Sequence, residues 1–225
     1  MIQQKFDFSE FARPLFSNRV AMAWSDPRAP MPRLMGDEVL VIEQVTAARA
    51  REFGAGRAAA RAAMEMLGHV PRPVLQGEDR APVWPPGLTG SITHSARDCL
   101  AVVTDAPDIA ALGLDLEPTA PLEPALWPEI CCPEEMNWLA SLGPSQRGHF
   151  AKLIFCAKEA TYKAQYQISR TMLEFHDVAL EVDLHAGRFD ATIRPELPGL
   201  TAGTCITGRF VILSGNIVAA VELAA

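Results

Sequence analysis

The stretch "ALGLDLEP", residues 111–118, places Asp115 and Glu117 two positions apart at the end of an apolar run. In a β-strand, residues i and i+2 face the same way, so the two carboxylates share one face and Leu114 and Leu116 share the other. At about 7 Å and an effective dielectric near 20, the carboxylates repel each other by roughly 2 to 3 kcal/mol. A divalent cation such as Mg²⁺ offsets this repulsion, but for the pair alone a solvated strand end explains it more simply.

A second polar stretch, "HFAKLIFCAKEATYKAQYQI", follows at residues 149–168 and has the period of a helix. On a helical wheel its apolar residues gather into one stripe, which predicts a face buried in the core. This stripe comprises Phe150, Leu153, Ile154, Ala157, Ala160, Ala164 and Ile168. The opposite side is too aromatic for an ordinary solvated face and is typical of a cleft wall. It carries Phe155, Glu159, Tyr162, Lys163 and Tyr166. Taken alone, Glu159 and Lys163 are explained more simply by an exposed i, i+4 ion pair.

Over the whole chain, the two halves are expected to contain the same secondary-structure elements in the same order. Each half is expected to contain a long helix, a turn-rich stretch and a hairpin, with the helices within residues 36–68 and 146–167. The hairpins are expected in "SITHSARDCLAVV" and in "TCITGRFVILSGNIVAAVEL". The sequence therefore predicts an α+β fold of two similar lobes, residues 1–112 and 113–225, with a site between them.

Composition excludes several classes of protein. The chain has 225 residues, 49 % of them hydrophobic, and a formal net charge of −7, which argues for a folded core and against a nucleic-acid surface. It contains no apolar run long enough to span a membrane and no signal peptide, so a soluble cytoplasmic protein is expected. The motifs of zinc enzymes and of Rossmann dinucleotide binders are missing. The five cysteines are expected to be reduced.

The segments "GSITHS", "GLDLEP" and "FCAKEATYKA" occur here in one order, preceded by "APVWPPG". In this combination the chain resembles the 4′-phosphopantetheinyl transferase superfamily, and specifically its long, monomeric, pseudo-duplicated branch typified by the enterobactin- and surfactin-synthetase-activating enzymes. The similarity runs from about residue 51 to residue 167. Each short motif is unspecific, whereas G-[ILV]-D-x-E followed some forty residues later by [FW]-x-x-K-E-[AS]-x-x-K is a strong compound signature.

The resemblance implies a role for each matching residue. Asp115, Glu117 and Glu159 would hold Mg²⁺ on the pyrophosphate of coenzyme A, with Glu159 as the base and Lys163 neutralising the leaving group. The residues expected to bind coenzyme A are Arg51, Arg57, Arg61, Arg80, Ser91, Thr93, His94, Lys158 and Lys163. From spacing alone, a solvated helix face is the simpler interpretation of Arg51, Arg57 and Arg61. Many relatives have a basic residue where this chain has Asp79, and Arg80 is expected to supply that charge.

The implied reaction is the Mg²⁺-dependent transfer of 4′-phosphopantetheine from coenzyme A to a serine of an apo acyl, peptidyl or aryl carrier protein, with release of 3′,5′-ADP. Such phosphoryl transfer depends on positioning and charge neutralisation rather than on a protein nucleophile. The long form suggests siderophore or secondary-metabolite synthesis. Two alternatives remain at this point: a non-catalytic module that binds coenzyme A or a carrier protein, and a Mg²⁺-dependent phosphohydrolase.

Overall fold

A computed structural model describes residues 11–43 and 45–225 of the chain. The chain divides into two compact units, Met1–Pro107 and Asp108–Ala225. The sequence placed a boundary after residue 112, inside strand β6 (Ile109–Pro118), whereas the contacts assign the whole of this strand to the second unit. Each unit is described by itself below.

The first unit is built around an antiparallel sheet with the strand order β1-β5-β4. Its described elements are η1 (Arg13–Leu15), β1 (Ala21–Ser25), α2 (Glu38–Ile42), α3 (Ala47–Met66), β2 (Leu75–Gln76), β3 (Pro82–Val83), β4 (Thr89–His94) and β5 (Cys99–Thr104). Strands β4 and β5 form the predicted hairpin, whose turn is closed by a hydrogen bond from the Ser95 amide to the Asp98 carbonyl. The small hairpin β2-β3 lies between α3 and β4.

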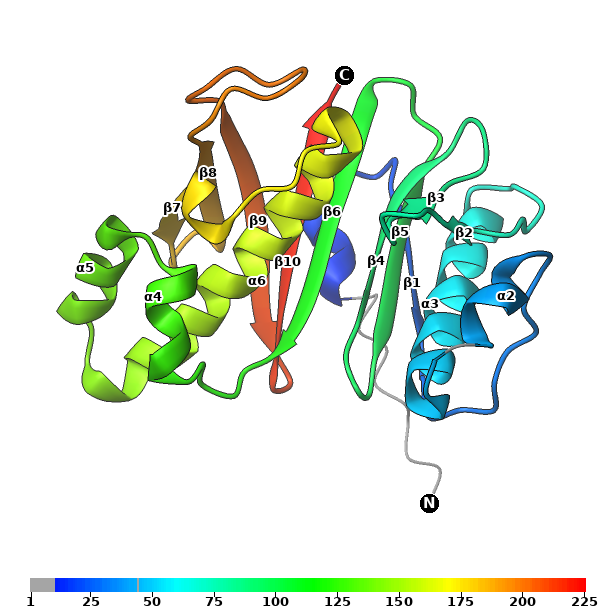
Figure 1. The fold of residues 1–225 in the computed structure, drawn as a ribbon, viewed down its shortest axis with the longest axis horizontal. Helices are drawn as coiled ribbons and strands as arrows, with labels where there is room; N and C mark the ends of the chain where they lie inside the picture. The colour runs from blue at the N-terminus through cyan, green and yellow to red at the C-terminus, as the bar shows by residue number, and fades with distance from the viewer. Residues whose placement is uncertain (1–10, 44) are drawn as a thin grey trace. The chain divides into compact units, whose positions relative to one another are not determined.

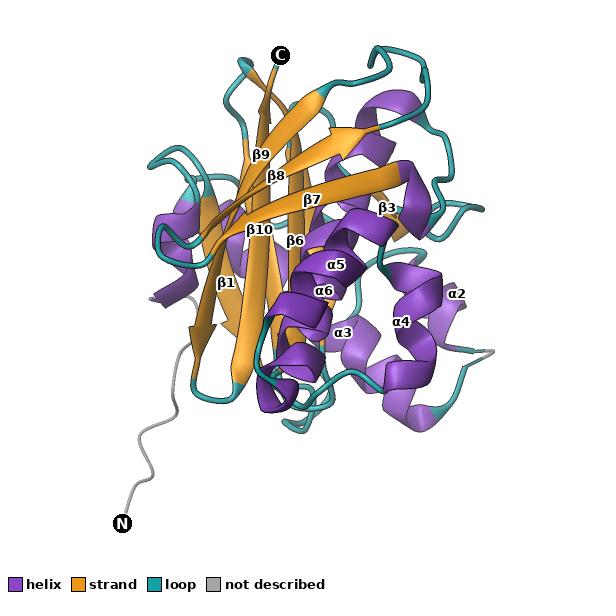
Figure 2. Ribbon diagram, turned by 90° about the vertical axis from the view of Figure 1, so that its left-hand side faces the viewer, coloured by secondary structure: helices purple, strands orange, loops and turns teal. Residues whose placement is uncertain are grey.

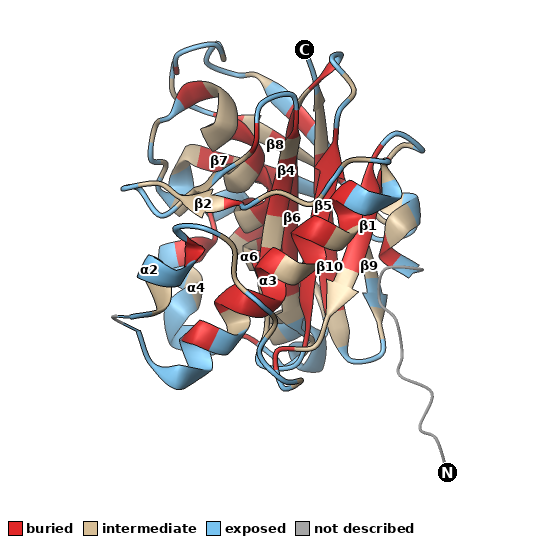
Figure 3. Ribbon diagram, turned by 90° about the vertical axis from the view of Figure 1, so that its right-hand side faces the viewer, coloured by how far each residue is buried: buried red, intermediate tan, exposed pale blue. Residues whose placement is uncertain are grey.

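Helix α3 packs on this sheet through small side chains, as Figure 3 shows by the buried residues of the helix over β1 and β5. Ala59, Ala60 and Ala63 are at most 1 % exposed and belong to one apolar cluster with residues of all three strands. Alanine favours the helix and lets it approach the sheet closely. The helix ends as predicted at Gly68, which has a φ of +83° that glycine adopts without strain.

The second unit contains the longest helix of the described chain and a five-stranded antiparallel sheet. Its elements are β6 (Ile109–Pro118), η2 (Pro124–Leu126), α4 (Trp127–Ile130), α5 (Pro133–Ser141), α6 (Pro144–Ser169), η3 (Phe175–Asp177), β7 (Val178–Asp183), β8 (Arg188–Ile193), β9 (Cys205–Leu213) and β10 (Asn216–Ala224). The strand order is β6-β10-β9-β8-β7. Helix α6 runs across one face of this sheet (Figure 1), and α4 and α5 lie on the same side (Figure 2).

The predicted apolar stripe of α6 forms the core of this unit. Leu153, Ile154, Ala157, Ala160 and Ala164 are fully buried, and Phe150 and Ile168 pack against the same cluster. This cluster includes residues from every strand of the sheet. The sequence prediction for the buried face of α6 is therefore confirmed.

The two units repeat one order of connection. In the first, a strand (β1) precedes the helix (α3), and the following hairpin pairs with it in the order β1-β5-β4. In the second, β6 precedes α6, and the hairpin β9-β10 pairs in the order β6-β10-β9. The internal duplication suggested by the sequence remains a prediction, and this shared topology is consistent with it. No helix in the described part of the chain has the length and apolar character needed to cross a membrane.

Candidate active site

The carboxylates of Asp115 and Glu117 lie on the face of β6 that is turned toward α6. Asp115 is 5 % exposed and Glu117 is half-buried, while Leu114 and Leu116 on the opposite face are at most 1 % exposed. The predicted alternation of the strand is therefore confirmed. Because both faces of β6 are buried at this point, Asp115 is not at a solvated strand end, which was the simpler interpretation of the pair.

A glycine brings α6 close to these carboxylates. A Cβ atom at Gly113 would stand 1.9 Å from the backbone oxygen of Ala160 on α6. Two side chains of α6 also donate to backbone carbonyls of β6: Lys163 to Leu114 at 3.1 Å and Gln167 to Leu112 at 2.6 Å. The backbone of α6 next to Glu159 is thus held directly against the strand that carries Asp115.

Three charged residues of α6 lie on one stripe of the helix. Glu159 follows Lys152 by seven residues and precedes Lys163 by four, so all three share a face at 3.6 residues per turn. The Nζ atom of Lys163 is 2.6 Å from Oδ1 of Asp115, and the Nζ atom of Lys152 is 3.1 Å from Oε2 of Glu117. Each carboxylate of β6 is therefore paired with its own lysine, with Glu159 between the two lysines on the helix.

Electrostatics couple these groups to one another. Burial raises the pKa of Glu159, and the charges of Asp115 and Glu117 raise it further against the opposing effect of Lys163. Burial and the charge of Asp115 likewise raise the pKa of Glu117. Burial lowers the pKa of Lys163, but the charge and hydrogen bond of Asp115 outweigh it and leave the pKa raised. The lysine therefore stays protonated, and Glu159 is a better proton acceptor than an exposed glutamate.

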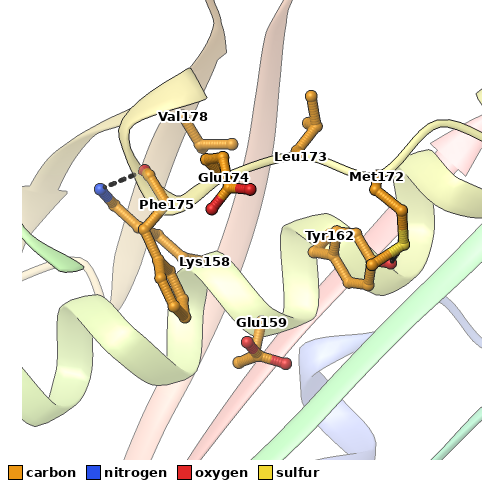
Figure 4. Close-up of a pocket in the computed structure, with 8 residues that line it drawn as sticks. All are labelled: Lys158, Glu159, Tyr162, Met172, Leu173, Glu174, Phe175 and Val178. Carbon is orange, nitrogen blue, oxygen red and sulfur yellow. Dashed lines mark hydrogen bonds between the residues drawn. The ribbon is translucent and has the colours of Figure 1, made fainter. Parts of the chain in front are cut away.

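A pocket with a volume of about 190 Å³ opens beside Glu159, on the aromatic side of α6 that was predicted to be a cleft wall. Figure 4 shows its lining: Lys158, Glu159, Tyr162, Met172, Leu173, Glu174, Phe175 and Val178. Phe175 packs on Phe155, with ring centroids 5.7 Å apart. Most of the wall is apolar. Glu159 thus borders both this pocket and the pairs of lysine and carboxylate.

Lys158 differs from the prediction that it binds coenzyme A. Its side chain is 2 % exposed, and its Nζ atom lies 2.8 Å from the carbonyl oxygen of Ile130, 2.9 Å from that of Phe175 and 2.9 Å from Oε2 of Glu135. Figure 4 shows the ammonium group directed at the backbone oxygen of Phe175. Its donors are therefore used inside the fold and not by a phosphate.

Arg57 and Arg61 also differ from their predicted role, because both guanidinium groups are buried. Arg57 donates to the carbonyl of Val74 at 2.6 Å, and burial lowers its pKa to about 10. Nη1 of Arg61 lies 2.9 Å from both carboxylate oxygens of Glu38, and Nη2 donates to the carbonyl of Arg33 at 3.0 Å. Neither arginine is part of a solvated helix face, and both fix loops of the first unit to α3.

This geometry predicts a loss of stability when the buried ion pair is broken. We expect Arg61→Ala to lower the free energy of unfolding by about 3 to 5 kcal/mol, because it leaves the fully buried Glu38 without its counter-charge. Denaturant unfolding followed by circular dichroism measures the difference. The control is Arg51→Ala, at an exposed position of the same helix, which we expect to change stability by less than about 0.5 kcal/mol. Equal stability of the two variants would contradict the structural role of Arg61.

The remaining predicted residues of the first unit are Arg51, Arg80, Ser91, Thr93 and His94. Arg51 and Arg80 are exposed, and Arg80 lies in the turn between β2 and β3 with a φ of +65°. Ser91 and Thr93 share one face of β4 and are buried, whereas His94 points to the opposite face. The strand therefore separates the histidine from the two hydroxyl groups, which the sequence motif had grouped together.

Sequence reasoning missed two charged residues of this region. Lys152 has no place in the motif, although its spacing of seven residues from Glu159 could have identified it. Arg49 contacts His94 and lies 3.3 Å from Glu52 on the first turns of α3, in the same basic run as Arg51. Its contact with His94 had no signal in the sequence, because 45 residues separate them.

Comparisons with known proteins identify the class of this site. Residues 37–104 match the 4′-phosphopantetheinyl transferase N-terminal domain, and residues 111–206 match the 4′-phosphopantetheinyl transferase superfamily. The chain is 36 % identical over 204 residues to 4′-phosphopantetheinyl transferase Svp of Streptomyces mobaraensis, covering 88 % of this chain and 82 % of that protein. It is 33 % identical over 209 residues to PptT of Mycobacterium tuberculosis, covering 90 % and 91 % respectively.

A more distant similarity covers about half of the chain. Enterobactin synthase component D of Escherichia coli is 37 % identical over 118 residues, which are 52 % of this chain and 54 % of that protein. Taken with the two longer matches, these findings agree with the resemblance seen in the motifs. The chain belongs to the 4′-phosphopantetheinyl transferase superfamily and is an enzyme of this transferase class.

Proposed function

We propose that this enzyme transfers the 4′-phosphopantetheine group of coenzyme A to a serine of an apo carrier protein, with Mg²⁺, and releases 3′,5′-ADP. The observation that carries this proposal is the position of Glu159. Its carboxylate borders an apolar pocket on one side and a group of two carboxylates and two lysines on the other. A phosphoryl donor with an apolar arm needs both environments next to each other. The names of the relatives support the same reaction.

Asp115, Glu117 and Glu159 are the proposed holders of the metal ion. Their chemistry fits, because Mg²⁺ prefers carboxylate oxygens, and the charges of Asp115 and Glu117 are close enough to Glu159 to raise its pKa. Among the residues that the structure describes, no three acidic, histidine or cysteine side chains form a ready-made metal site. The lysines instead hold Asp115 and Glu117. When bound, Mg²⁺ neutralises phosphate charge as a Lewis acid.

The protein's own side chains supply the remaining chemistry. The serine oxygen forms a bond to the phosphorus that bears pantetheine, the bond from that phosphorus to the bridging oxygen breaks, and 3′,5′-ADP leaves with the bonding electrons. We propose that Glu159 accepts the serine proton, for which its raised pKa suits it. Lys163 remains protonated and stabilises the charge that develops on the leaving group.

The pocket beside Glu159 is the proposed place for part of the pantetheine arm. Tyr162, Leu173 and Phe175 offer it apolar surface, and Glu159 lies at its border. In this proposal, the phosphate end of the arm lies near the carboxylates and the thiol end lies away from them. Binding energy from the arm is thereby available to orient the reacting phosphorus.

In the first unit, Arg51 and Arg80 are the proposed ligands of the 3′-phosphate, because both are exposed and guanidinium groups bind phosphate well. Ser91, Thr93 and His94 remain proposed contacts, with the histidine acting from a different face of β4 than the hydroxyl groups. Arg57, Arg61 and Lys158 are omitted from this set because their donors are used within the fold. The names of the relatives favour a carrier from siderophore or secondary-metabolite synthesis.

Intact-mass spectrometry tests the proposal directly. A panel of apo acyl, peptidyl and aryl carrier proteins is incubated with the enzyme, coenzyme A and Mg²⁺, beside a parallel reaction containing EDTA. We expect a gain of about 340 Da on at least one carrier, which EDTA abolishes. Binding of coenzyme A without any mass gain would favour a non-catalytic binding module. Metal-dependent consumption of coenzyme A without carrier modification would favour a phosphohydrolase.

A further inference from the structure

The ammonium group of Lys158 is the centre of a buried polar group behind the pocket. Besides its ion pair with Glu135 at 2.9 Å, it donates to the carbonyls of Ile130 and Phe175 and lies 3.4 Å from the sulfur of Cys132. These partners come from α4, α5 and η3 or their ends, whereas Lys158 belongs to α6. One side chain thus ties three neighbouring elements to the helix that carries Glu159.

Glu135 completes this group from the other side. Its Oε2 atom accepts a hydrogen bond from the Cys132 amide at 2.6 Å, and its Oε1 atom accepts one from the Leu180 amide of β7 at 2.8 Å. Both side chains of the ion pair are at most 2 % exposed. Buried charges persist only when each has an opposite charge and hydrogen bonds, and here both conditions are met.

The hydrogen bond from Lys158 to the carbonyl of Phe175 links the buried polar group to the wall of the pocket. Phe175 forms part of the pocket wall, and its ring packs on Phe155 of α6. Because Lys158 holds this carbonyl at 2.9 Å and directly precedes Glu159, it determines how far the wall stands from Glu159. A shift of the wall by about 1 Å is enough to misplace a bound arm relative to the reacting groups.

We propose that Lys158 and Glu135 are positioning residues that hold the wall of the pantetheine pocket against Glu159, and that Lys158 contacts no phosphate of coenzyme A. The inference rests on the proposed function, because it assigns the pocket to the pantetheine arm. According to this inference, the two parts of coenzyme A are recognised independently. Binding of the arm depends on the buried ion pair, whereas binding of the nucleotide and its phosphates does not.

Calorimetric titration with two ligands tests this separation. Coenzyme A contains the arm, and adenosine 3′-phosphate 5′-diphosphate contains the nucleotide and all its phosphates without the arm. We expect Lys158→Met to weaken the binding of coenzyme A at least tenfold and to change the affinity for adenosine 3′-phosphate 5′-diphosphate by less than twofold. Glu135→Gln is expected to act in the same direction. The control is Glu134→Gln, at the exposed neighbouring position, with no expected effect on either ligand.

The single variants leave one buried charge without its partner, so a double variant keeps the test decisive. Replacing both residues by apolar side chains, Lys158→Met with Glu135→Leu, removes the charges together and is tolerated in many proteins. It is expected to retain the affinity for adenosine 3′-phosphate 5′-diphosphate and to lose affinity for coenzyme A. An equal loss for both ligands, or no loss for either, would overturn the inference. Failure of the unaltered enzyme to bind coenzyme A would instead contradict the proposed function.

Discussion

Glu159→Gln is expected to lower kcat/KM for carrier modification by a factor of about 10² to 10⁴, the range for the loss of a general base. The substitution keeps the shape of the side chain and removes its charge. The proposed proton acceptor and one proposed metal ligand are then lost together. Lys163 also loses a nearby negative charge, although its pairing with Asp115 at 2.6 Å remains. The measurement is the initial rate of holo-carrier formation over a range of coenzyme A concentrations.

The distribution of this effect between kcat and KM is informative. We expect most of the loss in kcat, because Glu159 acts on the serine proton and on the charge of the transition state. Glu181→Gln is the matched control, since Glu181 is an exposed residue of β7 outside the pocket. Its rate should equal that of the unaltered enzyme. If Glu159→Gln kept more than half of the activity at saturating Mg²⁺, its roles as base and ligand would both be wrong.

Gly113→Ala is expected to have the largest effect on stability, with a loss of about 4 kcal/mol or more, or failure to fold. The added Cβ atom would stand 1.9 Å from the backbone oxygen of Ala160, far inside van der Waals contact. A backbone atom cannot turn aside as the end of a side chain can. Helix α6 must therefore move away from β6, which opens the core and separates Glu159 from Asp115. Denaturant unfolding and the rate of holo-carrier formation should fall together.

Gly143→Ala provides the comparison for this substitution. Gly143 precedes α6 with a φ of −58°, and its added Cβ atom would meet only the side-chain oxygen of Gln146, at 3.2 Å. We expect a cost of about 1 kcal/mol or less and full activity, because Ala is merely a weaker N-cap than Gly. Similar stabilities of the two variants would show that α6 does not depend on close approach at Gly113.

Much of the fold could be predicted from local patterns. The alternation of Asp115 and Glu117 with leucines gives the two faces of β6, and the helical stripe gives the core face of α6. Both features depend on the periodic spacing of apolar residues, which can be read from a short stretch of sequence. The hairpins could also be predicted, because short polar turns, residues 95–98 in one and residues 214–216 in the other, separate short apolar runs. The compound motif then indicated that β6 and α6 belong to one site.

The sequence could not show the partners of charged residues when those partners are distant in the sequence. Arg61 pairs with Glu38, 23 positions earlier, and Lys158 pairs with Glu135 in a different helix. Helix spacing cannot show such partners, so these side chains looked like solvated or ligand-binding groups. Lys152 illustrates the opposite case. Its position on the stripe of Glu159 was visible, but its contact with Glu117 depends on how α6 lies along β6.

The pairing of Lys152 and Lys163 with the carboxylates of β6 bears on the stability of the enzyme when no divalent cation is bound. Repulsion among three neighbouring carboxylates would destabilise the folded state if no positive charge compensated it. Here two counter-charges are built into the chain, so folding has no need of a divalent cation. We expect the protein to survive in a medium stripped of such cations. The proposed transfer reaction, in contrast, is expected to require Mg²⁺.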